Sequence, residues 1–270
     1  MSALRILDHL PDGLLAARPA DLARLLGGPT LFDLPGRDGA RAPLFVSTLL
    51  HGNEDTGFEA ARRVLARHAA HGLPRPLLLF LGNVAAAAAN RRTLPGQQDF
   101  NRVWPGTTLA PSPEQALIAD VFAYVRARAP LASIDIHNNT GLNPHYGCIN
   151  RLDERWFHLA RLFSRTVVYF TAPTGVQSGA MATLCPAVTV ECGKAGVAAN
   201  IDHAEAFIEA CLHLAALPQA ALPEHDLDLM RTGWIVRVPP AASLSFDGTP
   251  ADFEFRRDLD HLNFGELAAG

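Results

Sequence analysis

The sequence lacks the cysteine pattern of a disulfide-stapled or structural-zinc protein. It has four cysteines, and no two of them form a C-x-x-C pair: Cys148, Cys185, Cys192 and Cys211. A chain of 270 residues, 49% of them hydrophobic, can bury a sizeable core without cross-links. We therefore expect reduced and mostly buried thiols, as in a cytoplasmic protein.

Excess positive charge and long apolar runs are missing as well. The formal net charge is −4, which gives no reason to expect a nucleic acid or an anionic membrane surface as partner. The longest uncharged stretch, residues 166–190, is broken by Pro173, Gly175 and Pro186, so it is unsuited to span a bilayer as a helix. The first residues lack a basic start followed by a long apolar segment, and we expect no signal peptide.

Short apolar runs alternate with helical patterns along most of the chain. The runs are largely apolar rather than alternating, which is typical of strands that are covered on both faces. They occupy residues 43–50, 76–81, 131–136, 165–171 and 186–190, and helical patterns lie at 56–68, 113–128, 152–163 and 200–217. This order predicts an α/β fold with a mostly parallel mixed sheet and helices on both faces.

The charge-rich tail has a different character. We expect one main domain over residues 1–217 and a β-rich C-terminal segment over residues 218–270. Within that segment, Trp234–Val238 and Asp252–Arg256 resemble short strands. They would form either a small β appendage or the last edge of the main sheet, and the second arrangement would make the segment part of the same domain.

A histidine and a glutamate follow the first predicted strand three positions apart, in His51-Gly52-Asn53-Glu54. The carboxyl ends of strands in an open parallel sheet face the crevice where ligands bind. Imidazole and carboxylate are both zinc ligands, and a catalytic zinc site takes three protein ligands and a water. Helix capping by Asn53, Asp55 or Thr56, with Glu54 at the positive end of the helix, explains the acids in this turn, but it does not explain His51.

A second strand also ends in a histidine. His137 follows Ile136 in ASIDIHNN, so two strand ends present imidazoles to one crevice. His51, Glu54 and His137 together make a His₂Glu set of the catalytic zinc type. Asp135 is a candidate partner for the other nitrogen of a ligand histidine, unless it is a strand acid that faces solvent.

Two further pieces add groups that act on a substrate. Asn101-Arg102 pairs an amide with a guanidinium, a combination that binds carboxylates. Glu191 ends the strand AVTVE, and beside a zinc-bound water a carboxylate can act as general base and then as acid. The alternative for Glu191 is an ordinary strand-end acid paired with Lys194.

In this order the motifs resemble the aspartoacylase/succinylglutamate desuccinylase family, a branch of the zinc carboxypeptidase superfamily. The similarity covers about residues 43–196 and consists of His51-x-x-Glu54, the stretch from Asn83 to Arg92, Asp99-x-Asn101-Arg102, Asp135-Ile136-His137-Asn138 and Glu191-x-Gly193.

The resemblance implies a zinc carboxypeptidase-like catalytic domain and a role for each matching residue. His51, Glu54 and His137 would hold one zinc ion per chain, and Glu191 would be general base and acid. Asn101 and Arg102 would hold the carboxylate of the amino-acid part of the substrate. Arg92, nine positions after Asn83, would polarise the scissile carbonyl, with Arg91 as the alternative.

Two departures from the family concern the substrate. Aspartoacylase-like enzymes use a further arginine, shortly before the catalytic glutamate, to bind an acidic group of the substrate. Between Arg165 and Glu191 this chain has no lysine or arginine, and Gln177 and Ser178 are candidates to line that pocket instead. The carboxypeptidase superfamily often has a tyrosine late in the chain, and this chain has none there. Tyr146 is the nearest candidate for that role, although packing explains it as well. The neighbouring His145 is a further candidate to line the pocket, with the same alternative.

These patterns predict a zinc-dependent hydrolase that cleaves an amide bond next to a free carboxylate, in an N-acyl amino acid or a short peptide. The alternatives are a metallocarboxypeptidase that acts on short peptides and a non-catalytic metal-binding protein on the same scaffold. Cobalt, nickel or a second metal also remains open, because imidazole and carboxylate accept several divalent ions.

Overall fold

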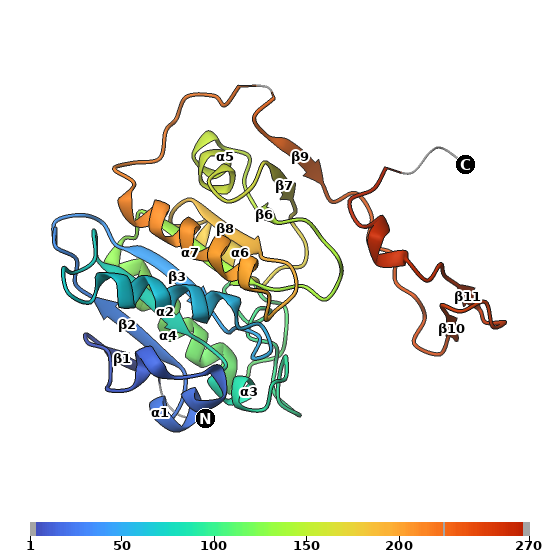
Figure 1. Cartoon of the computed structure of the whole chain (residues 1–270), viewed down its shortest axis with the longest axis horizontal. Helices are drawn as coiled ribbons and strands as arrows, with labels where there is room; N and C mark the ends of the chain where they lie inside the picture. Colours follow the sequence, from blue (N-terminus) through green and yellow to red (C-terminus); the bar gives the residue numbers. More distant parts are fainter. Residues whose placement is uncertain (1–3, 224, 267–270) are drawn as a thin grey trace.

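A nine-stranded sheet runs through the molecule in the computed structural model, which describes residues 4–223 and 225–266 (Figure 1). Its strands are β1 (Arg5–Leu7), β2 (Thr30–Leu34), β3 (Leu44–Thr48), β4 (Leu77–Leu81), β5 (Ala132–His137), β6 (Tyr146–Ile149), β7 (Thr166–Tyr169), β8 (Ala187–Glu191) and β9 (Asp228–Arg231). Their spatial order is β1-β2-β4-β3-β5-β8-β6-β7-β9. The β2–β4 and β6–β8 pairs are antiparallel, and the other neighbours are parallel. The predicted mixed, mostly parallel sheet is confirmed.

Helices cover both faces of this sheet. They are α1 (Leu22–Leu26), α2 (Thr56–His68), α3 (Val84–Ala88), α4 (Pro113–Arg128), α5 (Glu154–Arg161), α6 (Gln177–Met181) and α7 (Ala198–His213), with short 3-10 turns at Leu14–Ala16, Pro19–Asp21 and Leu259–Leu262. Within the described part of the chain, no helix combines the length and the apolar character needed to cross a membrane.

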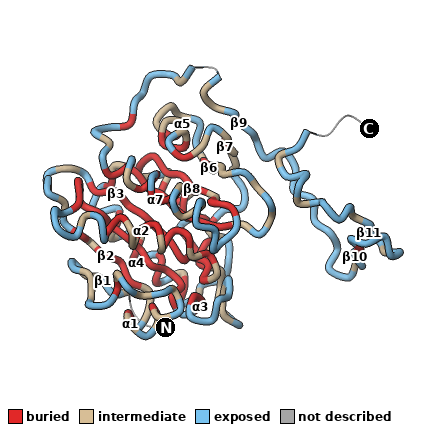
Figure 2. The backbone as a smooth tube through the Cα atoms, viewed as in Figure 1, coloured by how far each residue is buried: buried red, intermediate tan, exposed pale blue. Residues whose placement is uncertain are grey.

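The alternation of side chains along the strands divides the core into two layers. Leu44 and Val46 of β3 pack into the layer that includes α2, α5 and α7. Phe45, between them, packs into the opposite layer, with α4 and α6. Figure 2 shows the buried residues concentrated along the sheet and its inner helix faces. Strands that bury both faces explain why the sequence shows continuous apolar runs there.

Local signals placed two of the three long helices well, whereas α7 begins two residues and ends four residues earlier than its predicted range of 200–217. The predicted ranges 56–68 and 113–128 coincide with α2 and α4. The Ser112 side chain accepts a hydrogen bond from the backbone N–H of Gln115 at 3.2 Å, and Pro113 occupies the first turn of α4. A side-chain cap followed by proline is a strong start signal because it satisfies one orphan donor and removes another.

The C-terminal segment divides between two sheets. β9 extends the main sheet by pairing with β7, whereas β10 (Leu244–Ser245) and β11 (Phe253–Glu254) form a two-stranded sheet that projects from the body in Figure 1. The strand predicted at Trp234–Val238 is wrong, because those residues have no regular structure and Trp234 is 93% exposed. A strand needs a partner, and Asp228–Arg231 already occupies the edge beside β7.

Candidate metal centre

The carboxyl ends of two neighbouring parallel strands carry the predicted ligands. β3 and β5 pair in parallel, with Ser47 opposite Asp135. β5 ends at His137, and β3 is followed by Leu49, whose φ of 55° lies in the left-handed region. That turn redirects the chain into the His51–Glu54 segment before α2 begins at Thr56.

Gly52 lets this segment pass close to α3. A Cβ atom on Gly52 would lie 2.1 Å from the backbone nitrogen of Ala87, so any side chain there would collide with backbone. The backbone N–H of Gly52 also donates to the carbonyl of Arg92 at 3.2 Å. The hydrogen bond from Gly52 to Arg92 therefore ties the turn from His51 to Glu54 to the loop that carries Arg92.

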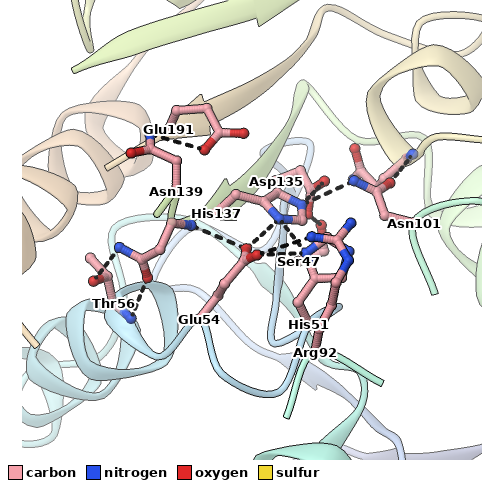
Figure 3. A network of polar contacts seen from close by, with 12 residues as sticks. Ser47, His51, Glu54, Thr56, Arg92, Asn101, Asp135, His137, Asn139 and Glu191 are labelled. Carbon is pink, nitrogen blue, oxygen red and sulfur yellow. Dashed lines mark hydrogen bonds and ion pairs between the residues drawn. The ribbon is translucent and has the colours of Figure 1, made fainter. Parts of the chain in front are cut away.

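Three side chains converge on one point, as Figure 3 shows. Nδ1 of His51 lies 2.8 Å from Oε1 of Glu54, and Nδ1 of His137 lies 2.7 Å from Oε2 of the same carboxylate. The two Nδ1 atoms are 3.2 Å apart. Donors on a tetrahedral zinc ion with bonds of ~2.0 Å are separated by about 3.3 Å, so this buried set has the chemistry and spacing to hold a metal ion.

The opposite nitrogen of each histidine is held by an aspartate. Nε2 of His137 lies 2.7 Å from Oδ2 of Asp135, whose other oxygen accepts a hydrogen bond from the Ser47 hydroxyl at 2.7 Å. Nε2 of His51 lies 3.0 Å from Oδ1 of Asp99. Such partners leave Nδ1 free to face the ion and fix the orientation of each ring. The proposed contact of Asp135 is present, and Asp99 is a partner that the sequence analysis did not assign.

Glu54 is anchored by the residue after His137. The backbone N–H of Asn138 donates to Oε2 of Glu54 at 3.1 Å, and the Asn138 side chain donates to Thr56 and to the carbonyl of Gly193. Burial alone raises the pKa of Glu54, but the charge and hydrogen bond of His137, with those of His51, outweigh it and hold the pKa well below its usual range. The carboxylate is thus ionised, as a ligand must be.

Glu191 lies beside this group at the end of β8. It is the residue opposite His137 in the β5–β8 ladder, and Nδ2 of Asn139 lies 3.5 Å from its Oε2. Burial raises the pKa of the Glu191 carboxyl; the charge of His137 lowers it, and that of Glu54 adds to the rise. A carboxyl with a raised pKa is better matched to proton transfer near neutral pH than an ordinary glutamate.

Asn101, Arg102 and Arg92 line the same cavity as the three ligands. The backbone N–H of Gln177 donates to Oδ1 of Asn101 at 2.8 Å, which leaves the amide nitrogen of Asn101 on the side of His137, 3.1 Å from Nε2. In the view of Figure 3, Asn101 and Glu191 flank His137 on opposite sides.

Arg92 points its guanidinium toward the ligand group. It donates to Oδ2 of Asp99 from Nε and Nη2 at 3.2 and 2.9 Å, and Nη1 lies 3.6 Å from Oε1 of Glu54. Arg91 and Arg92 are both exposed, but only Arg92 is among the residues that line the cavity. The geometry therefore favours Arg92 over Arg91 as the cation beside the ligands.

The cavity has a volume of about 640 Å³. Tyr146 contributes to its lining, whereas Gln177 and Ser178 do not; both are fully buried. Their expected place in the pocket is therefore wrong, because Gln177 turns inward and donates to the Ser133 hydroxyl. His145 also lies outside the lining, hydrogen-bonded to Asn200 at 2.8 Å.

A second donor group lies on the surface between α2 and α7. It consists of His68, Glu209 and His213. The side chain of His213 is 56% exposed, and Nη1 of Arg67 lies 3.5 Å from Oε2 of Glu209. The Arg67 guanidinium already neutralises the Glu209 carboxylate. The buried group of His51, Glu54 and His137 is therefore the stronger candidate for a metal site.

The comparisons with known proteins agree with this geometry. A family model described as "Succinylglutamate desuccinylase/Aspartoacylase catalytic domain" matches residues 42–215. That range includes every predicted ligand and substrate-contacting residue. A search of the curated proteins finds no match.

Solved structures share the fold at low sequence identity. The succinylglutamate desuccinylase of Chromobacterium violaceum matches with a TM-score of 0.61 and 21% identity, over 79% of this chain and 72% of that one. That of Vibrio cholerae gives 0.58 and 17%, over 76% and 66%. A product-bound structure of the ectoine utilization protein EutE (DoeB) of Ruegeria pomeroyi gives 0.55 and 17%, over 75% and 64%. The chain thus spans about two thirds of the length of these proteins.

Proposed function

The chain belongs to the succinylglutamate desuccinylase/aspartoacylase family of hydrolases, and on this premise we propose that it is a zinc-dependent hydrolase of amide bonds that lie next to a free carboxylate. The observation that carries the proposal is the meeting of His51, Glu54 and His137 at one point of a cavity that also contains Glu191 and two arginines. A single cavity therefore offers ligands for a metal ion, a base, and two cations for anionic groups.

We assign one zinc ion per chain to the Nδ1 atoms of His51 and His137 and the carboxylate of Glu54. Two imidazoles and one carboxylate are a catalytic ligand set, and three protein ligands leave a coordination position open. When bound, zinc lowers the pKa of a coordinated water toward neutrality and polarises a carbonyl oxygen. The protein contributes the fixed orientation of its ligands, through Asp99, Asp135 and the backbone of Asn138.

Glu191 is assigned as the proton carrier. As general base it removes a proton from the attacking water, and as general acid it passes that proton to the departing nitrogen. Its place opposite His137 in the β5–β8 ladder puts its carboxylate in the same cavity without making it a ligand. The raised pKa supports this assignment, because a weaker acid is a stronger base.

Arg92, Asn101 and Arg102 are assigned to the substrate. Arg92 places positive charge beside the ligand group and stabilises the oxyanion that forms on the scissile carbonyl. Asn101 and Arg102 bind the free carboxylate of the substrate by charge-assisted hydrogen bonds. Arg102 is positioned by a hydrogen bond from its Nη1 to the carbonyl of Asn101 at 2.7 Å.

We further assign the catalytic unit to residues 1–217. The segment from 218 to 270 adds Thr232 and Phe264 to the rim of the cavity. It therefore affects access to the site, while the ligands and Glu191 belong to the preceding part of the chain.

The requirement for a free carboxylate tests the proposal directly. We expect the zinc-loaded protein to hydrolyse N-acyl amino acids with a kcat/KM about 100-fold above that for their methyl esters, because the esters leave the Arg102 guanidinium unpaired. Amine release in a discontinuous assay, with and without chelator, measures it. Equal kcat/KM values for the acids and their methyl esters would show that the protein does not require the free carboxylate.

Short peptides run in the same assay separate the two enzymatic alternatives. A metallocarboxypeptidase would prefer dipeptides and tripeptides to N-acyl amino acids. A non-catalytic metal-binding protein would release no amine from either series while fully loaded with zinc.

Asp99→Asn should weaken zinc binding by about 10- to 100-fold, because the amide cannot hold the His51 ring as an anionic acceptor does. Competition with a chromophoric chelator measures the affinity. Asp120→Asn, at an exposed position of α4, is the matched control and should leave the affinity unchanged. An Asp99→Asn protein with the affinity of the wild type would show that His51 is oriented by other contacts.

A further inference from the structure

The floor of the cavity is one face of three neighbouring strands. Alternate residues of β8, β6 and β7 point into it: Thr189, Glu191, Tyr146, Cys148 and Val168. The register places Cys148 opposite both Thr189 and Val168, and Tyr146 opposite Glu191. The floor therefore extends continuously from Glu191 outward across the sheet to Val168.

Apolar side chains form the walls above this floor. Phe170, Pro173 and Val176 lie in the segment after β7 and line the cavity. Phe264 of the C-terminal segment closes the rim, with its ring centroid 4.8 Å from that of Tyr146 and a tilt of 52° between the planes. Contacts of this kind are typical of a pocket that receives an apolar group.

None of the three strands that form the floor contributes a cation to the cavity. Among the described residues that line the cavity, the arginines are Arg92, which reaches Asp99 and Glu54, and Arg102, which follows Asn101. The floor contributes the Cys148 thiol, the hydroxyl groups of Thr189 and Tyr146, and the side chain of Val168. A carboxylate placed on these strands would be buried without a cation from the floor to pair with it.

We propose that this floor binds an uncharged, apolar group of the substrate, so that the protein acts on amides with one free carboxylate and an apolar remainder rather than on dicarboxylates. The proposal rests on the hydrolase function proposed above. The apolar group is either the acyl chain or the side chain of the amino acid, since both can project past Glu191 from the scissile bond. The Arg102 end takes the carboxylate, and the Val168 end takes the apolar group.

Two pairs of matched substrates test the proposal and separate the two sources of the apolar group. N-acetylleucine and N-acetylaspartate differ only at the amino-acid side chain, where an isopropyl group replaces a carboxylate. N-isocaproylglycine and N-succinylglycine differ in the same way at the end of the acyl chain. We expect the apolar member of at least one pair to have a kcat/KM about 100-fold above its acidic isostere.

An acidic member that equals or exceeds its isostere in both pairs would overturn the proposal and leave the hydrolase function standing. If none of the four is hydrolysed, the hydrolase function fails, and calorimetric titration of the same compounds into the zinc-loaded protein decides the inference. Tighter binding of an apolar member then supports it, and equal or tighter binding of the acidic members in both pairs contradicts it.

Val168→Arg tests the location of the apolar group. A guanidinium on the floor should raise the ratio of acidic to apolar kcat/KM by at least about tenfold, because it supplies the missing partner for a carboxylate. Val236→Arg, at a position that is 89% exposed, is the matched control and should leave the ratio unchanged. If Val168→Arg does not fold, Phe170→Arg introduces the same charge from the wall. If the ratio of acidic to apolar kcat/KM is unchanged in a folded variant, the apolar group of the substrate does not bind on this floor.

Discussion

Glu191→Gln is expected to lower kcat by about 10²- to 10⁴-fold while the zinc content stays at one ion per chain. The amide keeps the shape of the side chain but accepts no proton at neutral pH, so both proton transfers lose their carrier. Glu191 is not part of the candidate ligand group of His51, Glu54 and His137. Amine-release kinetics and zinc analysis of the same preparation measure the two quantities. An active Glu191→Gln protein would refute the assignment of Glu191 as base.

The pH profile provides a second readout for the same residue. A general base must be deprotonated, so kcat/KM should fall as the pH is lowered through the pKa of Glu191. Because burial raises that pKa, the acid limb should lie above the ordinary glutamate value of about 4.3. Glu254→Gln, in the exposed strand β11, is the matched control and should retain the limb and the rate. The limb should be absent from the residual activity of Glu191→Gln.

Removal of a ligand should have the largest effect on metal binding. His137→Ala is expected to lower the zinc affinity by more than about 100-fold, beyond the loss expected for a residue that only orients a ligand. It leaves Glu54 and His51 as the two remaining protein donors, and it also removes the group that holds the Glu54 carboxylate at 2.7 Å. Zinc content after dialysis against chelator, together with activity, measures the loss.

His71→Ala is the matched control for this variant, because His71 is exposed after the end of α2. It should retain both zinc and activity. A His137→Ala protein that keeps one tightly bound zinc would show that the ion is held elsewhere. The surface group of His68, Glu209 and His213 would then be the first place to examine.

The convergence of the three candidate ligands could be predicted from the sequence because each of them stands in a recognisable local pattern. His51 lies three residues after the end of β3 and His137 is the last residue of β5, and both strands appear in the sequence as apolar runs because they are buried on both faces. Parallel pairing of β3 and β5 then brings the two ends together. Glu54 follows from its spacing to His51. The boundaries of α2 and α4 were equally accessible, since apolar periodicity marks α2 and the Ser112-Pro113 cap marks the start of α4.

The parts that were missed depend on contacts between distant residues. Asp99 meets the ring of His51, which is 48 positions away, and the motif Asp99-x-Asn101-Arg102 was the one signal that pointed to it. β6 is a short strand of four residues with a glycine inside, too brief to show a period, and so the cavity floor was not foreseen. Trp234–Val238 has the composition of a strand without a neighbouring edge, and composition alone does not show whether a partner exists.

Anomalous diffraction at the zinc edge, from crystals grown with one equivalent of zinc per chain, tests the central claim most directly. The account predicts a single strong peak within bonding distance, ~2.0–2.2 Å, of Nδ1 of His51, Nδ1 of His137 and a carboxylate oxygen of Glu54. A peak that lies away from these three side chains, or no peak in zinc-loaded protein, would contradict it.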